Sequence, residues 1–523
     1  MQAMKSGKGV AFAVFGVALS CAASAHASVT ISSAATTNMT CSGGVCAPTA
    51  KNAVLNVGDL ETLLASGNVT VTTTGTGVQA SDIDIKSALG WSSAGALSLL
   101  AKKSIEIASP VSITGLSGLT VTTGTKGTFS FGKKGSVTFS NLSSKLIING
   151  GTYTLVGDIQ TLASDIAANP NGDFALAGNY DASGWGGSTP IPTIFNGTFE
   201  GLGNTISNLD IARAALVNGF YYQALFAVLG ATGTVADIGL VNVSVTTSVK
   251  NVGAATLVGV SSGTIMFCYA SGVVVSKKEG GPGGLVGGNS GTIANSYAAV
   301  TVTGGKGRNG LPTGGLVAEN SGNIVKSYAT GATNGSSAGG LVGQNYGDIS
   351  SSYAKGNVSG LVGGGLVGFN SGAVTDSYAL GNAKGGVSGG LIGEASGTIS
   401  NSYAMGNVTG SNDAGGLVGD NGATISFSYS TGTVTGAATI GGLIGDDEAQ
   451  PGSITDSYWD TDTSGIMNLG QGAGNIANDP GITGLTTAQF QSGLPAGFDP
   501  TVWAENANID DGFPYLLANP PAK

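Results

Sequence analysis

The second half of the chain repeats one pattern of apolar and polar positions. A leucine opens each repeat, and a tyrosine follows it 12 residues later in the first seven copies and 15 residues later in the last. The leucines are Leu257, Leu285, Leu316, Leu341, Leu366, Leu391, Leu417 and Leu443. The tyrosines are Tyr269, Tyr297, Tyr328, Tyr353, Tyr378, Tyr403, Tyr429 and Tyr458. All other variation in length falls after the tyrosine, which is typical of a stacked repeat with its loops on one edge.

Other positions recur at fixed distances from the leucine. The sixth residue after it is mostly glycine, and the eighth is isoleucine or valine from Ile265 to Ile425. The fourth is asparagine in Asn289, Asn320, Asn345, Asn370 and Asn421, and departs from asparagine at Ala395 and Asp447. If the repeats stack as parallel strands, the leucine and isoleucine columns form a dry core and the tyrosines an aromatic stripe. The asparagine amides then bond one another at a turn.

These columns predict an all-β fold, a right-handed parallel β-helix with a few short helices and a C-terminal cap. Parallel strands need crossover connections, and right-handed winding of such connections is strongly favoured. We expect a signal peptide at 1–27, an N-terminal β-helical region at 28–156, and a helix with an irregular connection and an entry coil at 157–215. The repeat β-helix follows at 216–470, and the cap at 471–523 covers the open last coil.

The region before the repeats contains short runs in which apolar residues alternate with Thr or Ser. Such period-two runs predict half-buried strands. They are Val69–Val71, Ile83–Ile85, Leu97–Leu99, Ile105–Ile107, Val111–Ile113, Leu119–Val121, Phe129–Phe131, Val137–Phe139 and Leu146–Ile148. Helical spacing predicts short helices at 56–67, 158–168 and 487–491. Residues 171–194 are expected to be irregular.

Composition excludes two other classes of protein. The chain has 523 residues, of which 91 are glycine, and only 10% are charged. A disordered chain would carry more charge and less Val, Ile and Leu. Collagen is excluded because no three-residue glycine period exists and only 14 residues are proline.

Residues 1–27 have the features of a secretory signal peptide. Lys5 and Lys8 precede the apolar run 10–19, and Ala25-His26-Ala27 forms a small-x-small cleavage site. A lipoprotein signal at Cys21 fits less well, because Ala18 occupies the place where a leucine is expected. No later run reaches the length of a membrane helix, so we expect a mature chain without a membrane-spanning segment.

Cleavage would remove the only histidine of the chain, His26, and change the formal net charge from −10 to −12. A mature chain without histidine cannot use it as a general base or a metal ligand. An acidic surface argues against nucleic acid as a partner. The glycine runs do not follow the strand-GxGxxG-helix order of nucleotide sites.

The cysteines favour structural roles. Cys41 and Cys46 are close neighbours in an exported chain, which predicts a disulfide; a metal site is less favoured because no further ligands accompany them. Cys268 takes the place that serine fills before the other repeat tyrosines. We expect it to be a small buried side chain rather than a reactive thiol.

The repeat GGLVGxNSGxIxxSYAxGxV resembles the GLUG motif of bacterial exported proteins, and SYWDTDTSG at 457–465 and DGFPYL at 511–516 resemble that family's closing pattern. CSGGVC, AVLNVGDLETLLASGNVTV and SALGWSSAGALSLLAKKSIEI in the region 28–156 resemble exported adhesins of the filamentous haemagglutinin type. The resemblance implies a β-helical protein, secreted or on the cell surface of a Gram-negative bacterium. It implies a host or bacterial surface glycan or protein as partner, and in some cases an outer-membrane two-partner secretion transporter. It carries over no catalytic residue.

The loops that follow two of the tyrosines are the first candidate site. They are the longest, at 276–282 and 304–313, and adjacent coils would place them side by side. They contain the four cations Lys277, Lys278, Lys306 and Arg308. Loops on a rigid scaffold often carry binding residues; tolerated surface insertions are the alternative.

Two acidic groups are the other candidates. Glu394, Asp420 and Asp446 share one column, which predicts carboxylates about 5 Å apart. This acidic ladder could be a solvated stripe, bind a cation, or hydrolyse a sugar bond. Asp460, Asp462 and Ser464 resemble the opening of a calcium loop, although Gln471 stands where its glutamate would be. Calcium is the only cofactor that the sequence suggests.

We therefore expect a surface adhesin or structural β-helix rather than an enzyme. The alternative is an extracellular polysaccharide lyase or hydrolase on the same scaffold. The absence of histidine from the mature chain and the presence of only two arginines, Arg213 and Arg308, weaken that alternative. A passive spacer without a ligand is a third possibility.

Overall fold

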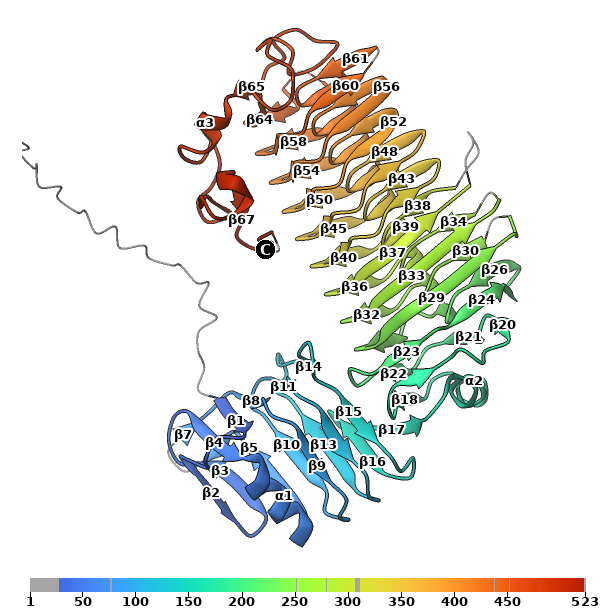
Figure 1. Ribbon diagram of the computed structural model, residues 1–523, viewed down its shortest axis with the longest axis vertical. Coiled ribbons are helices and arrows are strands. Elements are labelled where there is room, and N and C mark those ends of the chain that lie inside the picture. Colours follow the sequence, from blue (N-terminus) through green and yellow to red (C-terminus); the bar gives the residue numbers. More distant parts are fainter. Residues whose placement is uncertain are drawn as a thin grey trace, which may run out of the picture.

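The structure is a computed structural model that describes residues 28–75, 78–250, 252–278, 280–305, 311–436, 438–450 and 452–521. The expected signal peptide, and Lys306 and Arg308 of the second candidate loop, lie outside the described residues. Figure 1 shows strands stacked coil upon coil along the molecule, which confirms the all-β parallel solenoid. Three short α-helices occur in the described part, and no helix there is both long and apolar enough to cross a membrane.

Each repeat adds one strand to each of two stacked parallel sheets and one or more strands to a third. The strands that follow the leucines are β27 (Phe226–Leu229), β31 (Val258–Ser261), β35 (Val286–Asn289), β39 (Val317–Asn320), β44 (Val342–Asn345), β49 (Val367–Asn370), β53 (Ile392–Ala395), β57 (Val418–Asn421) and β62 (Ile444–Asp447). The second sheet contains β28 (Thr234–Ala236), β32 (Thr264–Met266), β36 (Thr292–Ala294), β40 (Asn323–Val325), β45 (Asp348–Ser350), β50 (Ala373–Thr375), β54 (Thr398–Ser400), β58 (Thr424–Ser426) and β63 (Ile454–Thr455).

The third sheet starts at the tyrosines. Its strands that contain the repeat tyrosines are β33 (Tyr269–Ser276), β37 (Tyr297–Thr303), β41 (Tyr328–Ala329), β46 (Tyr353–Ala354), β51 (Tyr378–Ala379), β55 (Tyr403–Ala404), β59 (Tyr429–Ser430) and β64 (Ser457–Asp460). β29 (Gly239–Thr247) precedes them and pairs with β33 in parallel. Equivalent residues of successive copies are therefore hydrogen-bonded neighbours.

The predicted columns of apolar side chains form the core. All eight repeat leucines are fully buried, and the Leu341 N–H donates to the Leu366 carbonyl oxygen at 2.8 Å. Ile349 pairs with Val374 in register. Because each leucine contacts the coils above and below, no single repeat could bury its own apolar surface.

The asparagine column forms the predicted ladder of amides. Asn320 Nδ2 donates to Asn345 Oδ1 at 2.8 Å, and Asn345 Nδ2 donates to Asn370 Oδ1 at 2.7 Å. Each amide also donates to the backbone two residues on, as Asn345 does to the Gly347 carbonyl oxygen at 2.9 Å. The ladder therefore satisfies buried polar groups at a turn.

A second polar ladder lies at the corner before the tyrosines. The hydroxyl of Ser352 accepts a hydrogen bond from the Ser327 N–H at 3.1 Å and donates to the Ser350 carbonyl oxygen at 2.8 Å. Two residues before each tyrosine, the backbone adopts a positive φ in Phe267, Asn295, Lys326, Ser351, Asp376, Asn401, Phe427 and Asp456. This left-handed residue turns the chain sharply into the third sheet. Cys268 is buried at the serine position, as predicted.

The nine predicted strands of the N-terminal region are confirmed. They are β5 (Val69–Thr72), β8 (Asp82–Ile85), β10 (Leu97–Leu100), β11 (Ile105–Ile107), β12 (Val111–Ile113), β13 (Gly118–Thr122), β14 (Phe129–Phe131), β15 (Val137–Phe139) and β16 (Lys145–Ile148). The helices are α1 (Val57–Ser66), capped by Asn56, α2 (Ile159–Ala168), capped by Asp158, and α3 (Thr487–Phe490), capped by Thr486.

The prediction of an irregular segment at 171–194 is wrong. This segment contains β18 (Asp173–Leu176), β19 (Tyr180–Asp181), β20 (Gly187–Ser188) and β21 (Ile191–Phe195). β18 does not alternate because it lies between two cores. Phe174 and Leu176 belong to the core of the repeats, whereas Ala175 and Ala177 belong to the N-terminal core. A strand buried on both faces has no polar positions to mark it.

The stack continues past residue 471, where the sequence ends the repeats. β65 (Ile482–Leu485) pairs in parallel with β64, and Ala473 forms a parallel bridge with Ile444. The chain after β65 then folds back along one side of the solenoid. In Figure 1 this red segment lies on the left, beside the edge that carries β45, β50, β54 and β58.

Candidate binding site: a partly covered tyrosine ladder

The repeat tyrosines stack face to face along the outside of the solenoid. Six successive pairs from Tyr269 to Tyr429 have ring centroids 4.6–5.1 Å apart, and their planes are within 13° of parallel. Strand register causes this arrangement, since each tyrosine pairs with the tyrosine of the next copy. We call Tyr269–Tyr458, the eight repeat tyrosines, the tyrosine ladder.

The chain's own C-terminal segment covers one end of the ladder. Tyr378, Tyr403 and Tyr429 are fully buried. They share a hydrophobic cluster with Phe490, Phe498, Trp503, Phe513 and Leu516. The Trp503 ring lies 6.0 Å from Tyr403 and 5.9 Å from Tyr429, tilted by 53° and 55°. We use the name cap for residues 486–521, the part of the predicted cap at 471–523 that covers the ladder side of the last coils.

The cap also provides hydrogen-bond acceptors for the tyrosine hydroxyls. Tyr403 donates to Asp510 Oδ2 at 2.7 Å, and Tyr429 to the Pro514 carbonyl oxygen at 2.5 Å. Tyr458 donates to the carbonyl oxygen of Ala496 at 2.8 Å. Burial is the main cause that raises the pKa of the Tyr403 and Tyr429 hydroxyls well above the ordinary value.

The other end of the ladder is uncovered. Tyr269, Tyr297, Tyr328 and Tyr353 are partly exposed. The last hydrogen bonds of the cap run from Asn519 Nδ2 to the carbonyl oxygens of Ser352 and Asp376, at 3.3 and 3.2 Å. The cap therefore stops where the buried part of the ladder gives way to the exposed part.

A pocket of about 660 Å³ adjoins the uncovered rings. Tyr269, Tyr297 and Tyr328 form one wall, with Phe267 and Asn295 from the left-handed corner. The N-terminal region contributes Phe131, Gly132, Lys133 and Gly135, and two later coils contribute Gly203 and Asp237. We call this the tyrosine pocket. Concave sites with aromatic walls and a few polar groups are typical ligand sites.

The ladder ends at the pocket because a glycine replaces the next tyrosine. Gly239 pairs with Tyr269 in register, and the Tyr269 ring lies directly over it, in the space that a side chain would need. Gly239 thus leaves one end of the ring stack without a further tyrosine.

Two carboxyl groups are buried beside the pocket. Glu200 Oε1 accepts a hydrogen bond from the Leu202 N–H at 3.0 Å, and burial raises the pKa of Glu200 to about 8. Burial, followed by the charge of Glu200, raises the pKa of Asp237 well above its ordinary value. Burial also raises the pKa of the nearby Cys268 thiol, which argues against a reactive cysteine. No sequence pattern marks this pair, because the two residues lie in different coils.

The candidate loops lie on a different edge from the ladder. Lys277 and Lys278 are exposed directly after β33. In Figure 1 β34 (Gly281–Pro282) and β38 (Thr313–Gly314), which adjoin the two loops, lie on the right edge, away from the cap. The loops and the tyrosine pocket are therefore separate candidate surfaces.

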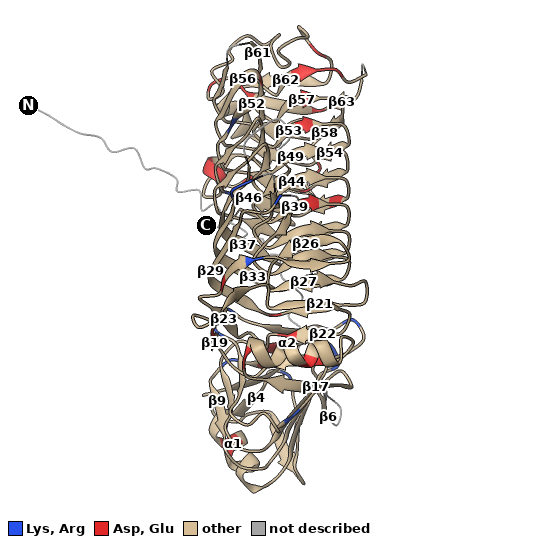
Figure 2. Ribbon diagram, turned by 90° about the vertical axis from the view of Figure 1, so that its right-hand side faces the viewer, with Lys and Arg blue, Asp and Glu red and all other residues tan. Residues whose placement is uncertain are grey.

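The acidic ladder has the register that its column requires. Glu394 pairs with Asp420, and Asp420 with Asp446. Burial is the main cause that raises the pKa of Asp420 to about 6, and the neighbouring acids Glu448, Glu394, Asp446 and Asp413 add to it. Charged positions are sparse on the solenoid, and Figure 2 shows acidic segments near β62 and β57.

Protein groups already bond the oxygens of the calcium-loop candidate. Asp460 Oδ1 accepts from the Asp462 N–H at 2.8 Å, and Asp460 Oδ2 from the Thr487 hydroxyl at 2.6 Å. Asp462 Oδ2 accepts from the Thr487 N–H at 3.0 Å, and Ser464 Oγ from the Ile466 N–H at 3.1 Å. These bonds tie the start of α3 to the last coil. No group of three or more His, Cys, Asp or Glu in the described ranges is placed to hold a metal.

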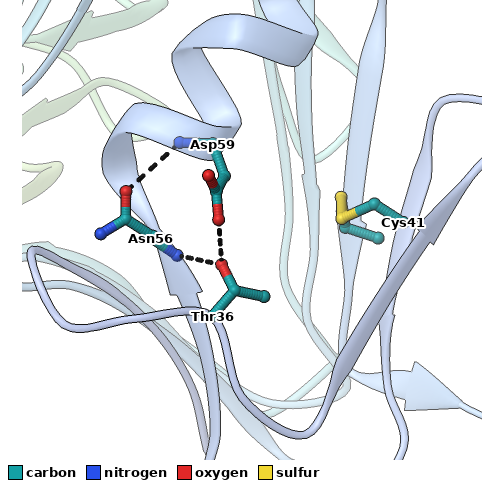
Figure 3. The surroundings of a disulfide bond; sticks show 5 residues. Thr36, Cys41, Asn56 and Asp59 are labelled. Atoms are coloured by element: carbon teal, nitrogen blue, oxygen red, sulfur yellow. Dashed lines mark hydrogen bonds between the residues drawn. A yellow bond between two sulfur atoms is a disulfide. The ribbon is translucent and has the colours of Figure 1, made fainter.

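Cys41 and Cys46 are joined by a disulfide across the hairpin of β2 (Met39–Ser42) and β3 (Val45–Pro48). Figure 3 shows the neighbouring polar cluster at the start of α1, where the Thr36 hydroxyl donates to Asp59 Oδ2 at 2.5 Å and accepts from the Asn56 N–H at 2.9 Å. A shallow pocket of about 340 Å³ adjoins Cys41 there. The disulfide thus closes a short hairpin beside the first helix.

Comparison with known proteins supports the repeat assignment. A family model for the GLUG motif matches residues 334–359. Over 131 residues the chain is 36% identical to halomucin of Haloquadratum walsbyi (strain DSM 16790 / HBSQ001). This alignment covers 23% of this chain and 1% of halomucin. The chain thus spans a very small part of that relative.

Two solved structures have a low overall similarity to this chain. An IgA1 protease has a TM-score of 0.35 and 19% identity, over 47% of this chain and 21% of the other. A putative immunoglobulin A1 protease from Bacteroides ovatus has a TM-score of 0.30 and 17% identity, over 70% of this chain and 92% of the other. Scores this low support no statement about activity. None of these four matches is a haemagglutinin-type adhesin, so that resemblance stays a prediction. What the strand pairing and the family model together establish is a parallel β-solenoid that carries the GLUG motif.

Proposed function

We propose that this protein is an exported adhesin that binds a partner at a cell or matrix surface through the uncovered part of its tyrosine ladder. A rigid solenoid with repeats of the GLUG type suits display at a surface. Secretion follows from the signal peptide expected at 1–27, and a two-partner transporter in the outer membrane is the export route that we propose.

One observation carries this proposal. Equivalent tyrosines have two different environments: the cap buries Tyr378, Tyr403 and Tyr429, whereas Tyr297 and Tyr328 remain partly exposed beside a pocket. Large aromatic surfaces left open next to a concavity are characteristic of binding sites. Tyrosine also suits this role because it is enriched among the residues that contribute most of the binding free energy at protein interfaces.

Substitution of the exposed rings tests the proposal. The double variant Tyr297→Ser/Tyr328→Ser should reduce adhesion of the purified protein to host-cell and bacterial surfaces by at least about tenfold, because two central contacts are lost. The control is Tyr346→Ser, which removes a tyrosine that is 48% exposed and lies outside the ladder. Equal adhesion of the double variant and the control would contradict the proposal.

The candidate loops are tested separately. Replacing Lys277, Lys278, Lys306 and Arg308 by serine removes the loop cations and leaves the ladder unchanged. If the loops attach the protein, this variant loses adhesion and the tyrosine variant retains it. We expect the opposite result, because the rigid aromatic surface is the more strongly preorganised of the two.

The acidic ladder supports a second candidate function, hydrolysis of a polysaccharide. The supporting observation is the register of Glu394 with Asp420 together with the raised pKa of Asp420, because a glycosidase needs one protonated and one ionised carboxyl group. Release of reducing sugar by the wild type, and its loss in Glu394→Gln and Asp420→Asn, would establish this activity. Binding without release would favour the adhesin.

A further inference from the structure

The cap shows which chemistry the ladder accepts, since the ladder repeats the same surface from coil to coil. Ring separation and tilt hardly change along it: Tyr297 and Tyr328 are 4.7 Å apart and 2° from parallel, and Tyr353 and Tyr378 are 4.9 Å apart and 3° from parallel. An alanine follows Tyr297, Tyr328, Tyr353 and Tyr378 alike. A partner suited to the covered end is therefore suited to the uncovered end.

The covered end is bound by a polypeptide with two kinds of group. Aromatic side chains pack at a tilt against the exposed edges of the rings, as Phe490 does at 5.4 Å and 42° from Tyr429. Acceptor oxygens take the tyrosine hydroxyls, and one of them belongs to the carboxylate of Asp510. The cap is acidic, with Asp499, Glu505, Asp510 and Asp511.

The uncovered end lies next to basic side chains. Lys133 is exposed at the tyrosine pocket, and Lys326 is exposed two residues before Tyr328. Lys355, 5.5 Å from the centroid of the Tyr353 ring, stands at the border with the cap, where its charge acts on Asp510. On a chain with a formal net charge of −10, Lys133 and Lys326 favour an acidic partner at the uncovered surface.

Ring orientation separates a polypeptide from a sugar. Tyr297 and Tyr328 face one another at 2° from parallel, so the neighbouring rings cover most of the ladder's flat faces. A sugar ring stacks on an open face, whereas a phenyl or indole ring also packs at a tilt against an edge. The ladder mainly offers edges and hydroxyl groups, as the cap contacts demonstrate.

We infer that the uncovered part of the tyrosine ladder, with the adjoining pocket, binds an acidic segment of a partner protein that carries aromatic side chains, in the manner of the protein's own cap. This inference rests on the proposed function and names the chemistry of the partner. The surface is continuous with the intramolecular interface, which ends at Asn519 beside Ser352 and Asp376.

A synthetic peptide with the sequence of residues 486–519 is the probe. Labelled at its N-terminus and titrated into the full mature chain, it should bind measurably. Tyr297→Ser/Tyr328→Ser should weaken binding by at least about tenfold, whereas Tyr346→Ser should leave it unchanged. A peptide with serine at Phe490, Trp503 and Phe513 should not bind, and one with amides at Asp510 and Asp511 should bind more weakly and with less salt dependence.

Two measurements keep the test decisive. Tyr297→Phe/Tyr328→Phe keeps the stacked rings and removes only the hydroxyls. This variant should therefore fold and still bind the peptide more weakly than the wild type does. Adhesion is measured on the same variants. Adhesion that needs these tyrosines without any peptide binding, or with binding to immobilised glycans instead, overturns the inference and leaves the proposed function standing. If the serine variant keeps both adhesion and peptide binding, the inference and the proposed function are both overturned.

Discussion

At the residue scale, Glu200 shows how a buried carboxyl group links stability to pH. Its pKa is raised by burial to about 8, and Asp237, Cys268 and Tyr153 are the titratable groups that interact with it. The folded protein therefore binds this proton more tightly than the unfolded chain does. Stability from this site is complete below the unfolded pKa of 4.5 and declines as the pH rises towards 8.

Glu200→Gln removes the ionisable group and keeps the shape. We expect the variant to unfold like the wild type at pH 4.5 and to be more stable at pH 8, by on the order of a few kcal/mol. Thermal melts at both pH values measure the difference. Glu106→Gln, at an exposed position, is the control and should differ little at either pH. A stabilisation of Glu200→Gln that does not change with pH would disprove the linkage.

At the scale of elements, the repeated polar ladders should differ in importance according to their burial. Asn345→Ala leaves the Nδ2 of Asn320 and the Oδ1 of Asn370 without their partners inside the coil. We expect a loss of about 2–4 kcal/mol, since each buried polar group left unsatisfied costs roughly 1–3 kcal/mol. Asn382→Ala is the matched control, because Asn382 belongs to an exposed column in which it accepts from the Asn407 N–H at 2.9 Å. Chemical denaturation measures the free energy of unfolding of both variants. Similar losses would show that burial does not determine how much each asparagine contributes to stability.

Most of these elements could be predicted because sequence columns and structural columns coincide. Leu341, Asn345 and Tyr353 each pack against the same residue of the next copy, so a repeat read along the chain gives contacts between coils. β18 could not be predicted in this way, since a strand between two cores lacks the alternation that marks a half-buried strand. Positive φ at Phe267 and Lys326 likewise contradicts local preference and is imposed by the corner of the coil.

The candidate site could be predicted only in part. The sequence predicts the tyrosine stripe, but the tyrosines that stay exposed and those that are buried have the same sequence surroundings. Coverage depends on where the cap folds, and Asp510 lies 107 residues from its partner Tyr403. The buried pair of Glu200 and Asp237 also arises only when separate coils stack.

At the scale of the whole molecule, the tyrosine pocket forms where the N-terminal region meets the repeats. The Val137 N–H donates to the Leu202 carbonyl oxygen at 2.9 Å, and the chain around Gly203 packs against Gly135 and Phe131. Gly203 has a φ of +73°, and a Cβ there would lie 2.5 Å from the Gly135 carbonyl oxygen and 2.9 Å from the Phe131 ring. A side chain at this position would push the two parts of the solenoid apart.

Gly203→Ala should therefore lower stability by about 1–3 kcal/mol and widen the molecule at the junction, because left-handed strain and a backbone clash act together. Gly219→Ala is the matched control: its φ is +86°, but nothing lies within 4 Å of the added Cβ, so only the strain of about 1 kcal/mol should appear.

Small-angle scattering should show a larger radius of gyration for Gly203→Ala alone. Partner binding at the tyrosine pocket should weaken in the same variant, since Gly203 and Gly135 form the wall opposite the rings. Unchanged scattering together with unchanged binding would mean that the junction tolerates the added methyl group and does not shape the pocket.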